Sequence, residues 1–246
     1  MHKSKKSKSA KDADAIVQKS IETLSNWQII LDSHFGTSSI STLADTYETQ
    51  LMAQPDAVNL SLLSSIQVYR DTINVFIEDI LKLERFVQLH IPAIEDGNNF
   101  GVSIQLEMCK LLKDTKAELQ KKLEALPAYL SSRAEAVEKL GLPKVVASET
   151  KTQSKTDATG GKDGDEKKSS TVLVTEEKTT DETKKGSTAH RMKHLISLDV
   201  QMYSNLRIGL LECMNSHLAI MDQMGKNKEK LLAPKGTQGR NTMTMY

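Results

Sequence analysis

The side chains best suited to chemistry in this sequence do not complete a catalytic or metal site. His190 and His194 are four residues apart, so a helix would place them on one face, but no carboxylate or thiolate accompanies them as a further ligand. Gly160-Gly161-Lys162 lacks the earlier glycine of a nucleotide-binding phosphate loop. No histidine follows a glutamate by three residues, as di-iron bundle enzymes require, and HExxH and GxSxG are absent. These absences disfavour an enzyme and predict no metal or cofactor.

Two short segments have features of a binding surface instead. The first, Ile91 to Gly101, joins two helical patterns through a proline, two glycines and several Asp and Asn residues that favour local turns. Ile94 and Phe100 would anchor such a loop, although a plain helix connector fits the same residues. The second is the polar stretch ending in Met245-Tyr246, which suits capture of a terminal carboxylate in a pocket. A frayed end is the simpler reading of that stretch.

Composition excludes several other classes of protein. The 246 residues carry 33 basic and 32 acidic groups, so the net charge of +1 gives no general attraction to nucleic acid or to an anionic membrane. Aromatic residues make up only 4%, which disfavours a β-sandwich or barrel. The longest uncharged stretch, from Ala57 to Tyr69, is shorter than the roughly 18 apolar residues of a membrane span. Two cysteines without CxxC spacing give no disulfide framework, so we expect a soluble intracellular protein.

Apolar residues recur at three- and four-residue steps over four long stretches, which predicts an all-α protein. The expected helices span residues 12–36, 62–90, 102–140 and 189–233, with a weaker helical pattern at 41–52. Pro127 lies inside the third stretch and must either kink or split that helix. The same stretch carries a heptad-like coiled-coil seam that includes Lys116 and Arg133. We therefore predict an elongated antiparallel four-helix bundle.

The chain divides by composition into a helical domain and polar additions. Residues 1–11 are lysines and serines, expected to form a disordered basic tail that either solubilises the protein or acts as a nuclear-localisation signal. Residues 12–246 form the single helical domain. Within it, 150–187 is expected to be a disordered charged insert, and 237–246 a polar tail. In an up-down-up-down bundle, the loop at 92–101 and the tail share one end, while the insert projects from the other.

Several of these segments resemble one family. The sequence IPAIEDGNNFGVSIQ, from Ile91 to Gln105, resembles the activation-loop signature of the 11S (REG-type) proteasome activators. Three further segments resemble the family in the expected order: Tyr129 to Val137 its third helix, Lys228 to Gly236 the end of its last helix, and Met245-Tyr246 its ending. The resemblance covers residues 60–140 and 189–246, whereas 1–55 match only in helical character.

The resemblance implies a non-enzymatic heptameric ring that caps the 20S proteasome without ATP. Its tails would dock between proteasome α subunits, which assigns docking to Met245 and Tyr246. Its activation loops would press on the turns that close the gate, with Asn98 at the apex. The loop residues carried over are Asp96, Gly97, Asn98, Asn99, Phe100 and Gly101. The expected partners are the α subunits and other copies of the chain, without nucleic acid, membrane or small-molecule substrate, at a cytoplasmic and/or nuclear location.

One departure from the family leaves an alternative open. The charged insert lies between the third and fourth helices, whereas the family's Lys/Glu-rich insert lies between the first and second. It could filter peptides, recruit partners or serve as a passive linker. The alternative function is a helical scaffold that tethers partners through the insert, and it predicts dimers or trimers in place of a heptamer.

Overall fold

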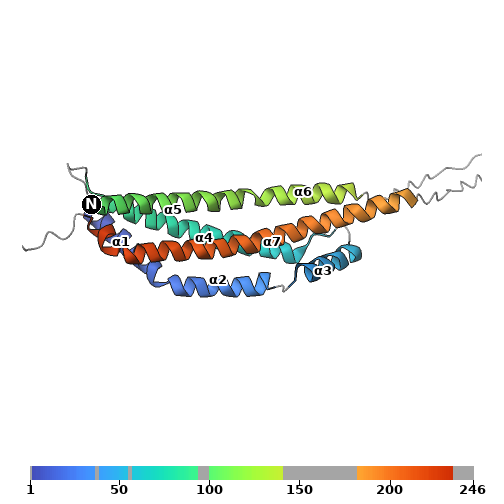
Figure 1. The fold of residues 1–246 in the computed structure, drawn as a ribbon, viewed down its shortest axis with the longest axis horizontal. Coiled ribbons are helices and arrows are strands. Elements are labelled where there is room, and N and C mark those ends of the chain that lie inside the picture. Colours follow the sequence, from blue (N-terminus) through green and yellow to red (C-terminus); the bar gives the residue numbers. More distant parts are fainter. Residues whose placement is uncertain (1, 37–38, 55–56, 94–99, 141–181, 235–246) are drawn as a thin grey trace, which may run out of the picture.

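The computed structural model describes residues 2–36, 39–54, 57–93, 100–140 and 182–234, and all regular secondary structure in this part of the chain is helical (Figure 1). The helices are α1 His2–Gln18, α2 Ser20–Phe35, α3 Ile40–Ala53, α4 Leu60–His90, α5 Phe100–Glu124, α6 Leu126–Lys139, α7 Glu182–Lys226 and α8 Lys228–Leu232. The predicted all-α class is confirmed.

The helices form an elongated bundle with four lengthwise segments. The helix α4, the helix α7 and the consecutive pair α5 and α6 run along the length of the rod, while α1, α2 and α3 follow one another along its flank (Figure 1). The long helix α7 packs against α2, α3, α4, α5 and α6, so it joins the segments. The antiparallel four-segment arrangement therefore matches the prediction, with the first segment broken into three helices.

Local signals define both ends of α4. The side chain of Asn59 caps its start, because Oδ1 accepts a hydrogen bond from the backbone N–H of Leu62 at 3.1 Å. The helix ends at His90, two residues before Pro92, as the sequence predicts. Between these ends the apolar positions face the core, and Ile73, Ile80, Leu83 and Val87 are fully buried.

Pro127 splits the third segment, which resolves the alternative that the sequence left open. The helix α5 ends at Glu124, and α6 begins at Leu126 with Pro127 in its first turn. A proline is tolerated there because the first backbone N–H groups of a helix have no intrahelical partner.

The predictions for the first segment are partly wrong. Residues 1–11 were expected to be disordered, but α1 begins at His2, and the single helix expected over 12–36 is interrupted at Lys19. The reason is that α1 has a face of small side chains that packs against α4, on which Ser9 and Ala13 are buried. Lys5, Lys8 and Lys11 are exposed, and Lys6 is half-buried. The helical pattern at 41–52 is confirmed as α3.

The prediction of a disordered insert at 150–187 is also wrong for its last six residues, 182–187, which belong to α7. The helix α7 begins at Glu182, because Glu182, Lys184 and Lys185 favour helix and extend it towards the N-terminus. The rest of the insert and the tail at 237–246 lie outside the described residues, so their disorder remains a prediction.

His217 lies in the aromatic core where α2, α4 and α7 meet. Its ring centroid is 5.2 Å from that of Trp27 and 5.5 Å from that of Phe76. The Nε2 atom is 3.2 Å from the hydroxyl of Ser20, while Nδ1 is buried and has no partner among the described residues. Burial lowers the pKa of His217 below its ordinary value of 6.5, and the nearby carboxylate of Asp79 offsets this only in part.

This lowered pKa predicts a loss of stability in acid. The unfolded chain binds a proton at this histidine more readily than the folded chain, so the stabilisation is complete above pH 6.5 and is lost as the pH falls below it. We expect His217→Gln to flatten the dependence of the unfolding free energy on pH between 7.5 and 5, by up to about 1.4 kcal/mol per pH unit. Urea denaturation across this range tests it, and identical slopes for both proteins would contradict it.

Candidate functional site at one end of the bundle

The structure describes only some of the residues expected to act. Phe100 and Gly101 are the first two residues of α5. The other expected residues lie outside the described residues: Asp96, Gly97, Asn98, Asn99, Met245 and Tyr246. Their roles therefore stay predictions, whereas the residues that flank them are described.

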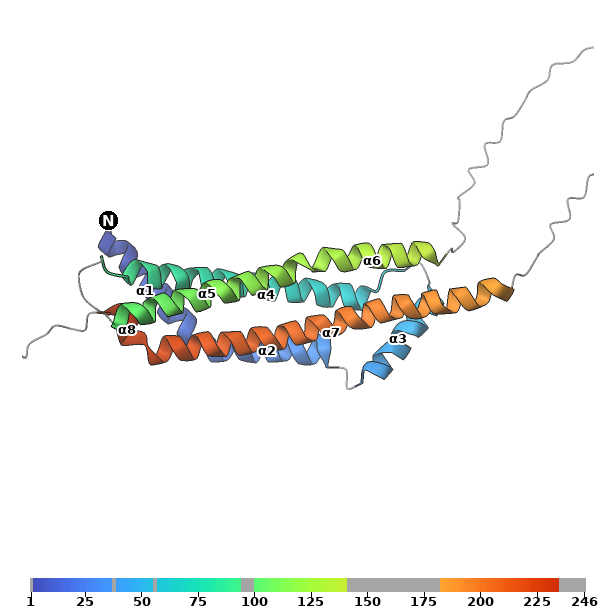
Figure 2. The same ribbon diagram turned by 45° about the horizontal axis from the view of Figure 1, so that its top comes forward.

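The described flanks of the loop and of the tail meet at one end of the bundle. The end of α4, the start of α5 and the short helix α8 lie together there, as Figure 2 shows. The end of α6 and the start of α7, which flank residues 141–181, lie at the opposite end (Figure 2). The alternation of helix directions predicts this arrangement of the flanking residues.

Gln105 ties these three flanks together. Its side chain is fully buried, and its Nε2 group donates to the carbonyl of His90 at 3.1 Å and to that of Leu231 at 2.9 Å. His90 is the last residue of α4, and Leu231 belongs to α8. One amide therefore fixes the end of the helix before the loop to the helix before the tail.

The backbone of Gly101 also lies against the last described residue before the tail. A Cβ atom placed on Gly101 would be 2.6 Å from the Cα atom of Pro234, so any larger residue would displace one of the two segments. The preceding residue, Phe100, is 68% exposed, and the ammonium group of Lys230 lies 4.5 Å from its ring centroid. This end thus presents an apolar ring beside a cation.

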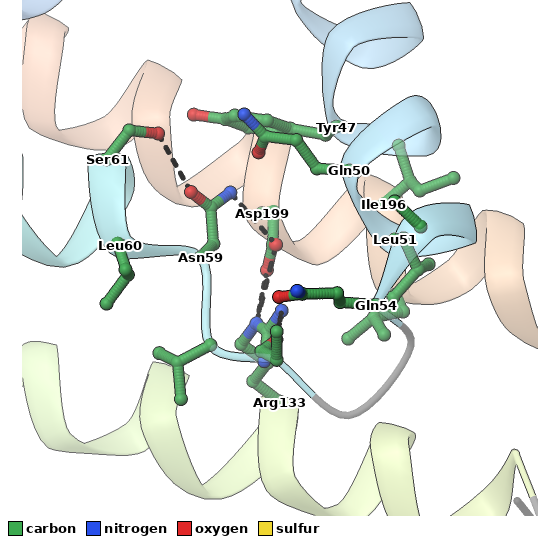
Figure 3. Close-up of a pocket in the computed structure, with 14 residues that line it drawn as sticks. Tyr47, Gln50, Leu51, Gln54, Asn59, Leu60, Ser61, Arg133, Ile196 and Asp199 are labelled. Carbon is green, nitrogen blue, oxygen red and sulfur yellow. Dashed lines mark hydrogen bonds and ion pairs between the residues drawn. The ribbon is translucent and has the colours of Figure 1, made fainter.

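A second cluster of polar side chains lies towards the opposite end and lines a cavity of about 280 Å³ (Figure 3). Asp199 on α7 accepts hydrogen bonds from Arg133 Nε at 3.0 Å, from the hydroxyl of Tyr129 at 2.8 Å and from Asn59 Nδ2 at 3.3 Å. Arg133 also donates to the carbonyl of Ala57 at 3.3 Å. The cluster therefore joins α6 and α7 to the start of α4.

The electrostatics of this cluster favour a structural role. Burial and the neighbouring charge of Asp199 raise the pKa of Tyr47 to about 12, and the same causes raise the pKa of Tyr129. Neither phenol can therefore serve as a base near neutral pH. The Asp199 carboxylate is held by three donors, so it is a paired buried charge and not a free nucleophile.

Breaking this ion pair is expected to destabilise the fold strongly. Arg133→Leu leaves the Asp199 carboxylate buried without its cation, which should lower the free energy of unfolding by about 3–5 kcal/mol. Lys139→Leu is a suitable control, because Lys139 and its partner Glu135 are exposed and 3.8 Å apart, and such pairs contribute about 0–1 kcal/mol. Urea denaturation at one protein concentration measures both, and equal losses would contradict the assignment.

The remaining candidates show no chemistry of their own. His190 and His194 are exposed near the start of α7, and no group of three His, Cys, Asp or Glu side chains in the described ranges could hold a metal ion. Cys109 and Cys213 are buried, and burial raises the pKa of Cys213 to about 12. Among the described helices, none is long and apolar enough to cross a membrane.

Comparison with known proteins identifies the family. Residues 57–157 match the model of the C-terminal part of the proteasome activator PA28, a range that includes Gln105 and Arg133. The chain is 27% identical over 201 residues to proteasome activator complex subunit 3 of Homo sapiens, and the same figures hold for the Gallus gallus protein. The chain is therefore similar to the PA28 (11S) family of proteasome activators. The resemblance seen in residues 91–105 is thereby confirmed.

The match covers 80% of this chain but only 61% of the length of its curated relatives. Solved structures agree in fold. The 11S subunit of the Plasmodium falciparum proteasome, PA28, has a TM-score of 0.61 at 18% identity, with 94% of this chain and 91% of that chain covered. The activator chain of a proteasome–11S activator complex has a TM-score of 0.60 at 14% identity, with 96% and 93% covered. The family consists of non-catalytic regulators, in agreement with the expectation that the chain is not an enzyme.

Two structural residues of this chain were not identified from the sequence. From its spacing, Arg133 was placed in the apolar seam of the third segment. A charged residue at such a position indicates a buried partner, but that partner, Asp199, lies 66 residues away in sequence. Gln105 sits four residues after Gly101 and three before Met108, on the buried face of α5. A glutamine at a core position is the signal that could have identified it.

Proposed function

We propose that this chain is an ATP-independent activator of the 20S proteasome that assembles into a heptameric ring. The ring caps the α-subunit face of the proteasome and opens its gate for the entry and exit of peptides. The observation that carries the proposal is the meeting of the loop flanks and the tail flank at one end, held by Gln105. Similarity to activators, one of them solved bound to a proteasome, supports it.

Binding and gate opening are separate tasks in this proposal. Met245 and Tyr246 dock in pockets between α subunits, and seven tails on one ring bind far more tightly than one tail alone. The activation loop, formed by Asp96, Gly97, Asn98, Asn99, Phe100 and Gly101, fits the gate residues better when the gate is open, and Gly101 anchors its end against Pro234. That differential affinity shifts the gate towards its open state.

The division of the chain follows from these tasks. Residues 2–246 form one activator domain, in which 150–181 is a charged insert and 237–246 the docking tail. The insert extends from the end facing away from the proteasome. Nucleic acid, membranes and small molecules are not partners, and the protein acts in the cytoplasm, the nucleus or both.

A peptidase assay tests the proposal. Purified protein is mixed with latent 20S proteasome from the same organism, without ATP, and hydrolysis of a short fluorogenic peptide is followed. The mass of the native assembly is measured in parallel. We expect a ring of seven chains and a several-fold faster hydrolysis. An assembled ring without stimulation would contradict the proposal, and a dimer or trimer would favour the scaffold alternative.

A further inference from the structure

Gln105 uses one side chain to satisfy two helix ends. The last carbonyl groups of a helix have no intrahelical partner, and both His90 and Leu231 lie in the last turn of their helices. A primary amide has two N–H donors on one nitrogen, and Gln105 donates to both carbonyls. The amide therefore sets the distance between the ends of α4 and α8 directly.

Gly101 provides a second fixed contact one helical turn earlier. Residues four apart lie on the same face of a helix, so Gly101 and Gln105 present adjacent points of α5 to the same neighbours. Gly101 fits against the backbone of Pro234, and Gln105 binds the carbonyl of Leu231, three residues before it. The start of α5 is thus held at two points to the segment that leads into the tail.

The Gln105 amide is also completely buried at this end of the bundle. Its exposed fraction is 0%, and its Oε1 atom is buried without a partner among the described residues. An apolar side chain of the same size would fill the space equally well, but it would leave both carbonyls without a donor. The glutamine is therefore explained by the connection it makes and not by packing.

We propose that Gln105 is a positioning residue that couples tail docking to gate opening. This inference rests on the proposed activator function. A tail that docks places α8, the Gln105 amide transmits that placement to the ends of α4 and α5, and these ends hold the activation loop. Without the amide, the tail still docks, but the loop no longer has one fixed position over the gate.

The test separates maximal stimulation from binding. Peptide hydrolysis by latent 20S proteasome is measured against increasing concentrations of Gln105→Leu and of wild type, after a native mass measurement shows that each ring has assembled. We expect maximal stimulation to fall by about five- to thirtyfold, within the range that coupling residues reach. The concentration for half-maximal effect should stay within about twofold of wild type, because docking is retained.

A variant at the other end controls for loss of stability. Asn59→Leu also removes a buried amide that makes hydrogen bonds, to Asp199 and to the start of α4. It should lower the melting temperature but leave maximal stimulation unchanged. If Gln105→Leu does not assemble, Gly101→Ala replaces it, because its Cβ atom displaces Pro234 while Gln105 stays intact. The same separation of stimulation from binding is expected.

Three outcomes would each overturn either the coupling role of Gln105 or the proposed function. Full stimulation by the assembled Gln105→Leu ring, or by Gly101→Ala when that variant is used, would overturn the coupling role. A parallel loss of binding and stimulation would overturn it as well, since it would show that the residue only supports folding or docking. Absence of stimulation by the wild-type ring would instead refute the proposed function.

Discussion

Removal of Met245 and Tyr246 is expected to abolish capture of the 20S proteasome by the ring. In the proposed assembly, each tail alone would bind weakly, and the ring would depend on seven linked contacts. Such avidity typically exceeds the affinity of a single contact by about 10²- to 10⁴-fold. We therefore expect the apparent affinity to fall by at least about 100-fold, with stimulation lost at every practical concentration. Surface-immobilised proteasome and a concentration series of the ring measure this.

A matched change within the tail provides the control for this truncation. Asn241→Ala with Thr242→Ala alters two polar tail residues and leaves Met245 and Tyr246 in place. This variant should bind within about threefold of wild type, because the docking contacts remain. Retained binding by the truncated chain, at wild-type ring mass, would show that the last two residues are not the docking contact.

The substitution Asn98→Tyr is expected to separate binding from activation in the opposite sense. The tails are unchanged, so the ring should bind within about threefold of wild type. In the proposed mechanism, a bulky phenol at position 98 would remove the better fit to the open gate, and stimulation should fall by about tenfold or more, equivalent to about 1.4 kcal/mol of lost differential affinity. Binding and peptide hydrolysis are measured on the same preparation.

The control for this variant is the same substitution at an exposed position of α2. Asn26→Tyr adds an identical side chain to the surface, away from the end where α5 and α8 meet. It should preserve both binding and stimulation. If Asn98→Tyr loses binding together with stimulation, the separate roles of loop and tail are wrong.

The periodicity of apolar residues predicted the long helices well, because these helices are stabilised by burial of a continuous apolar stripe. The helix α4 has such a stripe, a capping Asn59 and a terminating proline, and its limits agree with the prediction within two residues. The start of α1, residues 2–11, was missed because lysines dominate its composition. The buried Ser9 gives no apolar signal there, and the helix is stabilised by tertiary packing on α4.

The polar connections of the site were less predictable, because they depend on residues far apart in the chain. Gln105 and Leu231 are separated by 126 positions, and Asn59 and Asp199 by 140. Sequence patterns report which residues face the core, but not which carbonyl or carboxylate they meet there. Lys116 and Arg133 illustrate this. Both lie in the predicted seam, and they pair with Glu84 and Asp199 on other helices.

In the proposed complex, the end of the bundle where α5 and α8 meet faces the proteasome, and site-specific cross-linking tests this orientation. Leu232 is 40% exposed at this end, and His190 is exposed at the opposite end, whereas both native cysteines are buried. A short photoactivatable cross-linker is attached to Leu232→Cys or to His190→Cys in otherwise unchanged rings bound to 20S proteasome. We predict α-subunit adducts from position 232 and none from position 190, while adducts from position 190 alone would contradict the claim.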